Sequence, residues 1–133
     1  MKELNPTKLP VILTGDFNIA HQPIDLARPK ENENSAGYYI EEREAMSRFL
    51  ARGYADTFRR LHPDRVEYSW WSYRGGARAR NVGWRIDYFC VDEALMKQVK
   101  NAWICGEVTG SDHCPVALVL VAPRKAGKRN QRP

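Results

Sequence analysis

The sequence predicts a mixed α/β or α+β layer structure in which strands outnumber helices. The chain has 133 residues, a length that suits one domain. Short apolar runs rich in β-branched or aromatic residues recur between polar turns, which is typical of strands. Hydrophobic residues make up 43% and charged residues 28%, a globular mix that excludes a collagen-like or wholly disordered chain.

The predicted strands are short runs bounded by glycine or polar residues. The first (PVILT) ends at Gly15, and the second, rich in aromatic residues, precedes the Gly75-Gly76 pair. In chain order the predicted strands cover residues 10–14, 68–73, 85–91, 102–106 and 116–121.

Residues 40–50 are predicted to form a helix because their apolar side chains recur at helical intervals. Three glutamates lie in its first turns, where the helix dipole favours acids, and Gly53 follows as a stop signal. A second, short helix is predicted over residues 92–99. Residues 16–37 contain two prolines and several asparagines and are predicted to form a long loop. Loops of that length are usually functional or disordered.

The formal net charge of +5 comes from the carboxy-terminal end. Residues 124–133 hold five basic residues and no acid, and the rest of the chain has 16 residues of each sign. Such a tail is most often solvated and disordered, with non-specific contact to nucleic acid phosphates as the alternative. The charge alone therefore indicates little about partners.

Composition also predicts the compartment. The apolar runs are too short to span a bilayer, and no charged segment followed by an apolar one opens the chain, so we expect neither a membrane partner nor a secretory signal. The three cysteines, Cys90, Cys105 and Cys114, are odd in number and unclustered, which is typical of reduced thiols. We expect a cytoplasmic protein, associated with the nucleoid if the source is prokaryotic.

Three short segments place polar groups beside apolar strands: GDFN at residues 15–18, WRIDY at 84–88 and GSDH at 110–113. Strand ends often hold catalytic groups because the sheet positions them rigidly. Taken alone, Asp16 suits a turn and His113 suits a structural histidine. Asp87 lies within an apolar strand, where an unpaired carboxylate is costly, so we expect a histidine or arginine partner for it.

Together, GDFN, NVGWRIDYF and GSDHCP, in this order and spacing, resemble the carboxy-terminal half of the exonuclease III/AP endonuclease family, part of the endonuclease/exonuclease/phosphatase superfamily. The intervening HQPIDLARPKENENSAGY and WWSYRGGARAR are also similar, and the resemblance covers about residues 8–121. It implies half of a four-layer αββα sandwich (a DNase I-like fold), with a mixed, mainly antiparallel sheet and flanking helices. Residues 1–122 are then this half domain, and residues 123–133 are the basic, disordered tail.

The resemblance implies catalytic roles for Asp16, Asn18, Asp87 and His113. Asp16 is expected to activate or orient the attacking water, and Asn18 to hold that water or the oxyanion. His113 is expected to bind the scissile phosphate, with Asp87 fixing the tautomer of its imidazole. A divalent cation, Mg²⁺ or alternatively Mn²⁺, is expected to be held by Asp16, Asn18, Asp112 and His113.

The resemblance also implies two surfaces for DNA. Trp70, Trp84 and Ile86 match a pocket for a flipped-out abasic sugar, with core packing as the alternative. A glycine-rich basic loop is expected to reach DNA phosphates, with a merely solvated loop as the alternative. Its expected DNA contacts are Tyr73, Arg74, Arg78, Arg80, Asn81 and Arg85. Further phosphate contacts are expected from Asn34 and Ser35.

The implied function is a metal-dependent DNA phosphodiesterase of base excision repair that cleaves 5′ to abasic sites, with 3′–5′ exonuclease activity as a further expectation. Its partner is double-stranded DNA with abasic sites. The family's amino-terminal half, which supplies the principal metal-binding glutamate, has no counterpart in this sequence. We therefore expect a fragment that is weakly active or inactive alone and needs that half from the full-length chain or another subunit.

Two alternatives stay open. One is another phosphodiesterase of the same superfamily, against which the Trp70 and Trp84 pocket and the arginine-rich loop count. The other is a non-catalytic partial domain that binds DNA or a partner. The intact candidate catalytic positions count against this second alternative.

Overall fold

The computed structural model describes residues 9–122 and has the predicted α+β fold. The predicted basic tail lies outside the described residues. In chain order the elements are β1 (Ile12–Asp16), the 3-10 helices η2 (Pro23–Asp25) and η3 (Lys30–Asn32), α1 (Ile40–Ala51), β2 (Tyr54–Asp56), α2 (Thr57–Leu61), β3 (Trp70–Trp71), η4 (Arg74–Gly76), β4 (Gly83–Trp84), β5 (Asp87–Asp92), η5 (Glu93–Gln98), β6 (Val99–Ile104) and β7 (Val116–Leu120). No helix in this part of the chain is long and apolar enough to cross a membrane.

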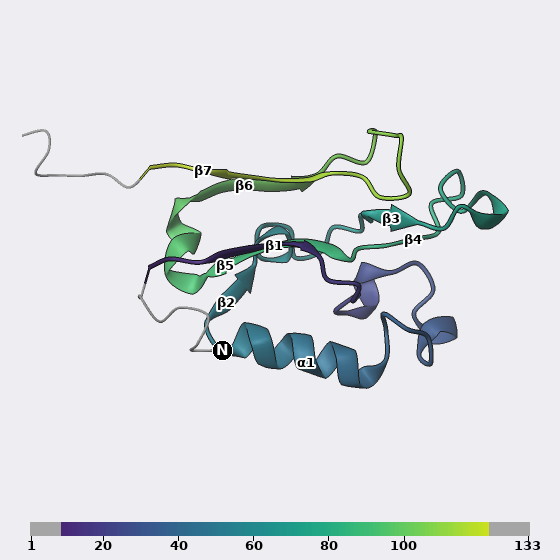
Figure 1. Cartoon of the computed structure of the whole chain (residues 1–133), viewed down its shortest axis with the longest axis horizontal. Coiled ribbons are helices and arrows are strands. Elements are labelled where there is room, and N and C mark those ends of the chain that lie inside the picture. Colours follow the sequence, from purple (N-terminus) through teal and green to yellow (C-terminus); the bar gives the residue numbers. More distant parts are fainter. Residues whose placement is uncertain (1–8, 123–133) are drawn as a thin grey trace, which may run out of the picture.

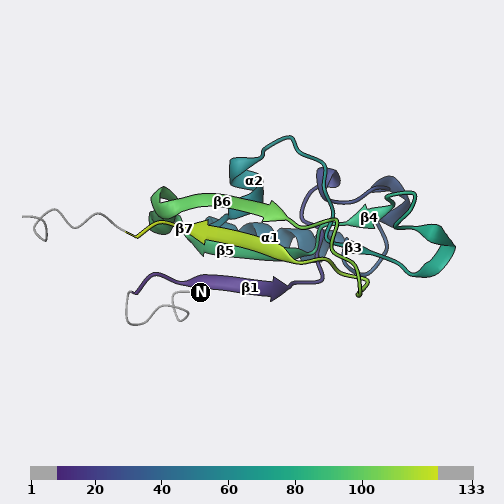
Figure 2. The same ribbon diagram turned by 90° about the horizontal axis from the view of Figure 1, so that it is seen from above.

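The strands form three small sheets in which every described pairing is antiparallel. β5 is central in the first sheet, with β1 on one side and β2 on the other, while β3 pairs with β4 and β6 with β7. Figure 1 shows the β6–β7 hairpin on one side of β1 and β5, and α1 on the other. Viewed from above, β1 lies at one edge of the molecule and α2 toward the opposite edge (Figure 2).

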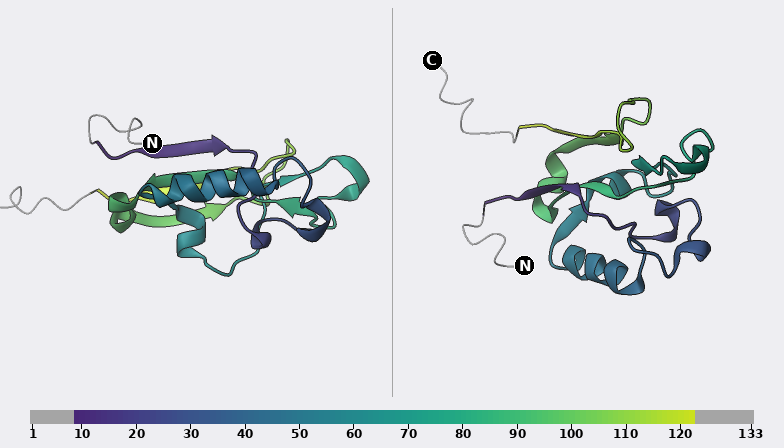
Figure 3. Two further views of the ribbon diagram at one scale, coloured as in Figure 1. Left: turned by 90° about the horizontal axis from the view of Figure 1, so that it is seen from below. Right: turned by 45° about the vertical axis from the view of Figure 1, so that its right-hand side comes forward.

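The core is divided between the two sides of β5 because its side chains alternate. Tyr88 and Cys90 pack with Met46 of α1. In the view from below, α1 lies in front of the strands (Figure 3). Val91 instead belongs to a cluster that Leu118 and Leu120 of β7 cover. This alternation, expected of a strand that is buried on both faces, fixes which β5 side chains face α1 and which face β7.

Several predicted boundaries differ from the structure. The first strand begins two residues later and continues to Asp16, and the predicted strand 68–73 is reduced to Trp70–Trp71. The strand predicted at 102–106 lies at Val99–Ile104, and the helix predicted at 92–99 is the 3-10 helix η5. The loop over residues 16–37 contains two 3-10 turns.

The prediction missed β2 and α2, which are short: β2 is buried throughout, whereas α2 is buried only at Thr57 and Phe58. Their residues, Tyr54–Leu61, show neither the alternation of a half-buried strand nor room for a helical period. Asp56 marks the junction because its carboxylate accepts a hydrogen bond from the backbone N–H of Arg59, as a helix N-cap does. Tertiary packing, and not local periodicity, selects both elements.

The strand predicted at 85–91 begins only at Asp87, because Arg85 turns its side chain, 1% exposed, into the interior between β4 and β5. Its Nε donates to Asp25 at 2.8 Å, and its two terminal nitrogens donate to Asp56 at 3.1 and 2.5 Å. Arg59 adds a bond of 2.6 Å to Asp25, so two arginines face two carboxylates. The backbone N–H of Arg85 also donates to the carbonyl of Asp25 at 2.7 Å. This cluster therefore joins the loop after β1, the end of β2 and the β4–β5 junction.

The charges of this cluster reinforce one another. Burial alone raises the pKa of the Asp25 carboxyl, but the charge and hydrogen bond of Arg85, together with Arg59, outweigh it and hold the pKa below its ordinary value. The guanidinium of Arg85 also lies between aromatic rings, 5.1 Å from the centroid of Phe58 and 4.6 Å from that of Tyr88. Leaving a buried charge of this cluster without its partner is therefore energetically costly.

Replacing Arg85 by methionine is expected to lower the free energy of unfolding by about 3–5 kcal/mol, because Asp25 and Asp56 then lose a buried partner. Urea unfolding of the 133-residue chain measures the change. Arg74→Met is the matched control, since Arg74 is exposed. An equal loss in both variants contradicts the structural role of Arg85.

Candidate active site

The structure brings Asp16, Asp87 and His113 together although they lie far apart in the sequence. Asp16 ends β1 and Asp87 begins β5, and the antiparallel register places them opposite each other. His113 precedes β7 and forms an isolated bridge with Trp70. One ligand atom from each of the three residues lies within 4.8 Å of the others. Three of the four predicted catalytic residues thus form one cluster.

His113 is held between the two carboxylates. Its Nδ1 lies 2.8 Å from Oδ2 of Asp87, and its Nε2 lies 3.7 Å from Oδ2 of Asp16. Partial burial alone lowers the pKa of His113, but the hydrogen bond and charge of Asp87, with smaller effects of Asp16 and Asp112, raise it above 6.5. Asp87 therefore has the histidine partner that its place in the sequence predicted. The two carboxylates therefore stabilise the imidazolium form relative to that of a free histidine.

The backbone of Asn18 orients the carboxylate of Asp16. The backbone N–H of Asn18 donates to Oδ1 of Asp16 at 2.8 Å, so that Oδ2 is the oxygen nearer His113. Asn18 has a φ of 56°, a left-handed conformation that asparagine tolerates better than most residues. The segment is therefore turned at Asn18 and not extended. The side chains of Asp16 and Asn18 therefore do not share one face, as residues two apart in an extended strand would.

The four predicted metal ligands do not form one group. Asp112 is outside the cluster, and its Oδ2 accepts a hydrogen bond of 3.0 Å from Nε1 of Trp70, which lowers the pKa of the Asp112 carboxyl. His113 donates through Nδ1 to Asp87, an arrangement that leaves Nε2 able to donate to a phosphate oxygen when protonated or to bind a metal ion when neutral. The half-exposed carboxylate of Asp16 offers the oxygen that Mg²⁺ prefers. The residues therefore fit a divalent cation at Asp16.

The predicted pocket residues lie next to this cluster. Trp70 and Trp84 are directly opposite on β3 and β4, their rings 6.3 Å apart in an edge-to-face arrangement. Both are half-buried and pack on a cluster that contains Ile86. Ile86 itself is buried, so it packs beneath the surface against the two rings and offers little surface of its own.

Gly37 permits the close approach of the preceding loop to Trp84. Its φ is +95°, and a Cβ there would lie 3.0 Å from the Trp84 ring and 3.2 Å from the carbonyl oxygen of Asn18. Asn34 and Ser35, the predicted phosphate contacts, lie in the turn just before it, Asn34 exposed and Ser35 half-buried. The loop over residues 16–37 is therefore anchored against the predicted pocket.

The predicted DNA-binding residues divide into two groups. Tyr73, Arg74 and Arg80 are exposed, Tyr73 at 79%. The side chain of Asn81 instead accepts a hydrogen bond from Nε1 of Trp71 at 2.9 Å. The prediction that Arg85 contacts DNA is wrong, because Arg85 is buried in the ion cluster with Asp25 and Asp56.

Arg78 is half-buried and bonded within the protein, and its contact with DNA stays a prediction. Its guanidinium stacks on Trp71 at 4.4 Å and donates to the backbone carbonyls of Gly106, Val108 and Ser111. These bonds occupy the side chain and connect the basic loop to the segment that leads into His113. Arg78 thus positions that segment.

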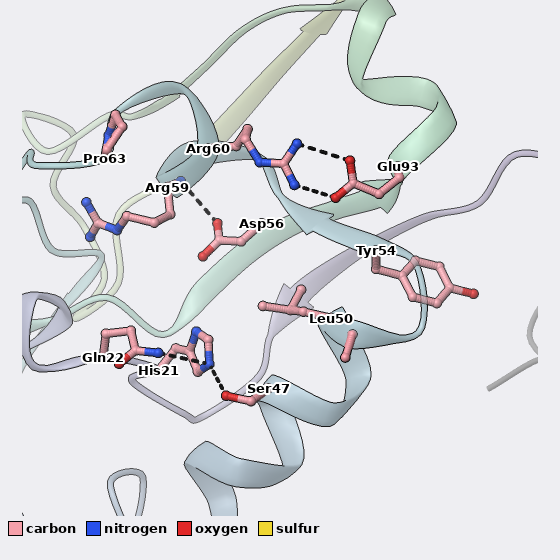
Figure 4. Close-up of a pocket in the computed structure, with 11 residues that line it drawn as sticks. His21, Gln22, Ser47, Leu50, Tyr54, Asp56, Arg59, Arg60, Pro63 and Glu93 are labelled. Atoms are coloured by element: carbon pink, nitrogen blue, oxygen red, sulfur yellow. Dashed lines mark hydrogen bonds and ion pairs between the residues drawn. The ribbon is translucent and has the colours of Figure 1, made fainter.

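A cavity of about 620 Å³ lies away from this cluster, between α1 and α2 (Figure 4). Asp16, Asp87 and His113 are not among its lining residues. Its polar groups already pair with one another: His21 Nε2 lies 2.7 Å from Ser47 Oγ, and Arg60 pairs with Glu93. Burial lowers the pKa of His21. These four side chains are therefore engaged with one another and connect the segments around the cavity.

Sequence reasoning missed the residues that hold the site together. Asp25, Asp56 and Ser69 are polar but buried, at 0%, 7% and 0% exposure. Nothing in the sequence neighbourhoods of Asp25 and Asp56 distinguishes them from turn or surface residues. Only the polar Ser69 inside the aromatic run YSWW is an available signal, because a hydroxyl in an apolar strand needs a partner.

Comparison with known proteins agrees with this geometry. Residues 1–113 match the Endonuclease/Exonuclease/phosphatase family. An exodeoxyribonuclease of Bacillus subtilis is 59% identical over 114 residues, which are 85% of this chain and 45% of that protein. The crystal structure of an AP endonuclease from Leishmania major superposes with a TM-score of 0.81 at 36% identity, over 84% of this chain and 35% of the other. A 3′ phosphatase from Neisseria bound to a product DNA hairpin gives 0.83 at 28% identity, over 91% and 48%. The chain thus spans about half or less of these proteins.

Replacing Asp87 by asparagine is expected to lower the pKa of His113, because the largest contribution that raises it is removed. In the unchanged chain, this pair stabilises the fold fully below pH 6.5, and the stabilisation is lost as the pH rises through the raised pKa. NMR titration of the His113 ring and urea unfolding across this range measure both effects. Asp64→Asn, at an exposed acid, is the control. An unchanged His113 titration in Asp87→Asn contradicts the pairing.

Replacing Gly37 by alanine is expected to lower the free energy of unfolding by more than about 1 kcal/mol, because the residue has a positive φ and its new methyl group meets Trp84. Urea unfolding followed by tryptophan fluorescence reports both the loss and the displaced ring. Gly106→Ala is the matched control, since nothing lies within 4 Å of a Cβ at that position. Equal behaviour of the two variants argues against this contact.

Proposed function

The chain belongs to the endonuclease/exonuclease/phosphatase family, and we propose that the complete protein is a metal-dependent DNA phosphodiesterase of base excision repair that cleaves 5′ to abasic sites. The observation that carries the proposal is the cluster of Asp16, Asp87 and His113. A charged donor beside a free carboxylate oxygen suits a reaction in which water attacks a phosphate and negative charge develops on its oxygens.

Each residue of the cluster has a distinct task in this proposal. His113, in its protonated form, donates from Nε2 to an oxygen of the scissile phosphate, while Asp87 fixes the ring through Nδ1. Asp16 orients the attacking water through Oδ2 and takes up its proton, since Oδ1 is already bonded to the backbone of Asn18. A divalent cation, Mg²⁺ in this proposal, is held by Asp16 and supplies charge neutralisation at the phosphate.

The surroundings of the cluster support DNA with a missing base as the substrate. Trp70 is paired with both Trp84 and His113, so the apolar rings adjoin the residue that faces the phosphate. A deoxyribose without its base fits an apolar wall of this kind. Tyr73, Arg74 and Arg80 are exposed on the neighbouring loop, where the two arginines suit backbone phosphates. The similar AP endonuclease and DNA-bound 3′ phosphatase structures add support for a DNA substrate.

The site needs a further part of the protein to be complete. Asp87 is engaged by His113, so Asp16 is the one carboxylate of the cluster that is free to bind Mg²⁺, and it supplies too few oxygen ligands by itself. The β6–β7 hairpin also presents an apolar face to solvent: Trp103 pairs with Ala117 and Asn101 with Val119, which places Trp103 and Val119 on the same exposed face. We infer that an amino-terminal half, absent from this chain, covers that face and supplies the missing ligands.

The proposal predicts cleavage of a fluorescent duplex with a single abasic site when this chain is mixed with a separately expressed amino-terminal half of a similar enzyme and Mg²⁺. EDTA is expected to abolish cleavage. Asp16→Ala is expected to reduce the rate at least about 100-fold and His113→Ala about 100- to 1,000-fold, because proton transfer and charge stabilisation are lost.

Asp64→Ala is the control for these variants, since Asp64 is exposed outside the cluster. Cleavage by the 133-residue chain alone contradicts the need for a second half. A folded mixture that cuts no abasic duplex contradicts the proposed function.

A further inference from the structure

Ser69 occupies the centre of the backbone that carries the candidate catalytic residues. It is completely buried and directly precedes β3. Its Oγ accepts hydrogen bonds from the backbone N–H groups of Ile86 at 3.0 Å and Asp87 at 3.1 Å. Its own N–H donates to the carbonyl of Trp84 at 2.9 Å, and its carbonyl accepts from Cys114 at 2.8 Å. One residue therefore contacts the backbone beside both Asp87 and His113.

The hydroxyl is needed because the strand ladder is interrupted there. β4 ends at Trp84 and β5 begins at Asp87, while Arg85 turns its side chain into the ion cluster. The N–H of Ile86, a buried residue, therefore needs another acceptor, and leaving it unpaired is costly. The Ser69 hydroxyl takes the place of a strand carbonyl for two successive N–H groups.

The same bonds reach the third candidate residue. The carbonyl of Ile86 accepts a hydrogen bond from the N–H of Phe17 at 2.9 Å, directly after Asp16. Ile86 is thus bonded to Ser69 on one side of its backbone and to the end of β1 on the other. Ser69 is therefore connected through Ile86 to the segment that carries Asp16.

We propose that Ser69 is a positioning residue for the reaction: its hydroxyl and its carbonyl together set the alignment of Asp87 with His113. The distance of 2.8 Å between Asp87 Oδ2 and His113 Nδ1 depends on two backbone segments that no shared strand ladder joins. Ser69 contacts both segments. Its catalytic consequence rests on the proposed function, whereas its effect on the Asp87–His113 hydrogen bond does not.

The test compares Ser69→Ala with Ser69→Thr, which keeps the hydroxyl. Thr57→Val is the matched control because Thr57 is also buried and its Oγ1 donates to a β5 carbonyl, that of Phe89, at 2.7 Å. The first readout is the NMR signal of the His113 Nδ1 proton at about pH 6, where imidazolium predominates. The second is hydrogen exchange of the Ile86 and Asp87 amides.

We expect Ser69→Ala to lose the His113 Nδ1 proton signal and to speed exchange of both amides at least about tenfold, as the loss of a buried acceptor implies. Ser69→Thr and Thr57→Val are expected to keep the signal. In the reconstituted mixture, Ser69→Ala is expected to lower kcat at least about tenfold with KM within about twofold, because alignment and not binding is lost.

A His113 signal that persists in folded Ser69→Ala, or that disappears equally in Thr57→Val, overturns the proposal. If Ser69→Thr does not fold, the comparison of Ser69→Ala with Thr57→Val decides. If the unchanged chain shows no cleavage in the mixture, the proposed function fails. The NMR and exchange measurements then decide the positioning role by themselves.

Discussion

The buried guanidinium of Arg85 is the constraint on which the rest of this structure depends. A charge that is almost completely removed from water requires partners on several sides, and Asp25 and Asp56 supply them from two different segments. The ion cluster therefore fixes the loop after β1 and the end of β2 relative to the β4–β5 junction. Because Arg85 lies between Trp84 and Ile86, it also fixes the apolar side of the candidate site.

The interruption of the strand at Arg85 has a second consequence. Backbone N–H groups that a continuous ladder would satisfy bond instead to the Ser69 hydroxyl. Asp16 and Asp87 share the first sheet, whereas the segment that carries His113 is joined to them through the hydrogen bonds of Ser69. Such a junction places polar side chains at a strand end, where they meet solvent and a ligand while their backbone stays rigid.

The candidate metal site and the exposed sheet face both agree with the proposed second half of the protein. Asp16 offers one carboxylate to a divalent cation, and the β6–β7 hairpin presents Trp103 and Val119 to solvent. The chain spans less than half of the length of the Bacillus exodeoxyribonuclease that it resembles, which agrees with this interpretation.

The sequence by itself determined the α+β class, the helix over residues 40–50 and the need of Asp87 for a partner, because periodicity and the cost of an unpaired charge are local properties. Its resemblance to a known family indicated which three segments meet. Only the tertiary structure decided that Arg85 is buried, that Arg78 holds the His113 segment and that Ser69 bonds to the β5 backbone. An arginine in a basic loop and a serine in an aromatic run have the same local pattern whether they face solvent or the core. Their environment is set by partners 29 to 60 residues away for Arg85 and 17 to 18 residues away for Ser69, which no local pattern contains.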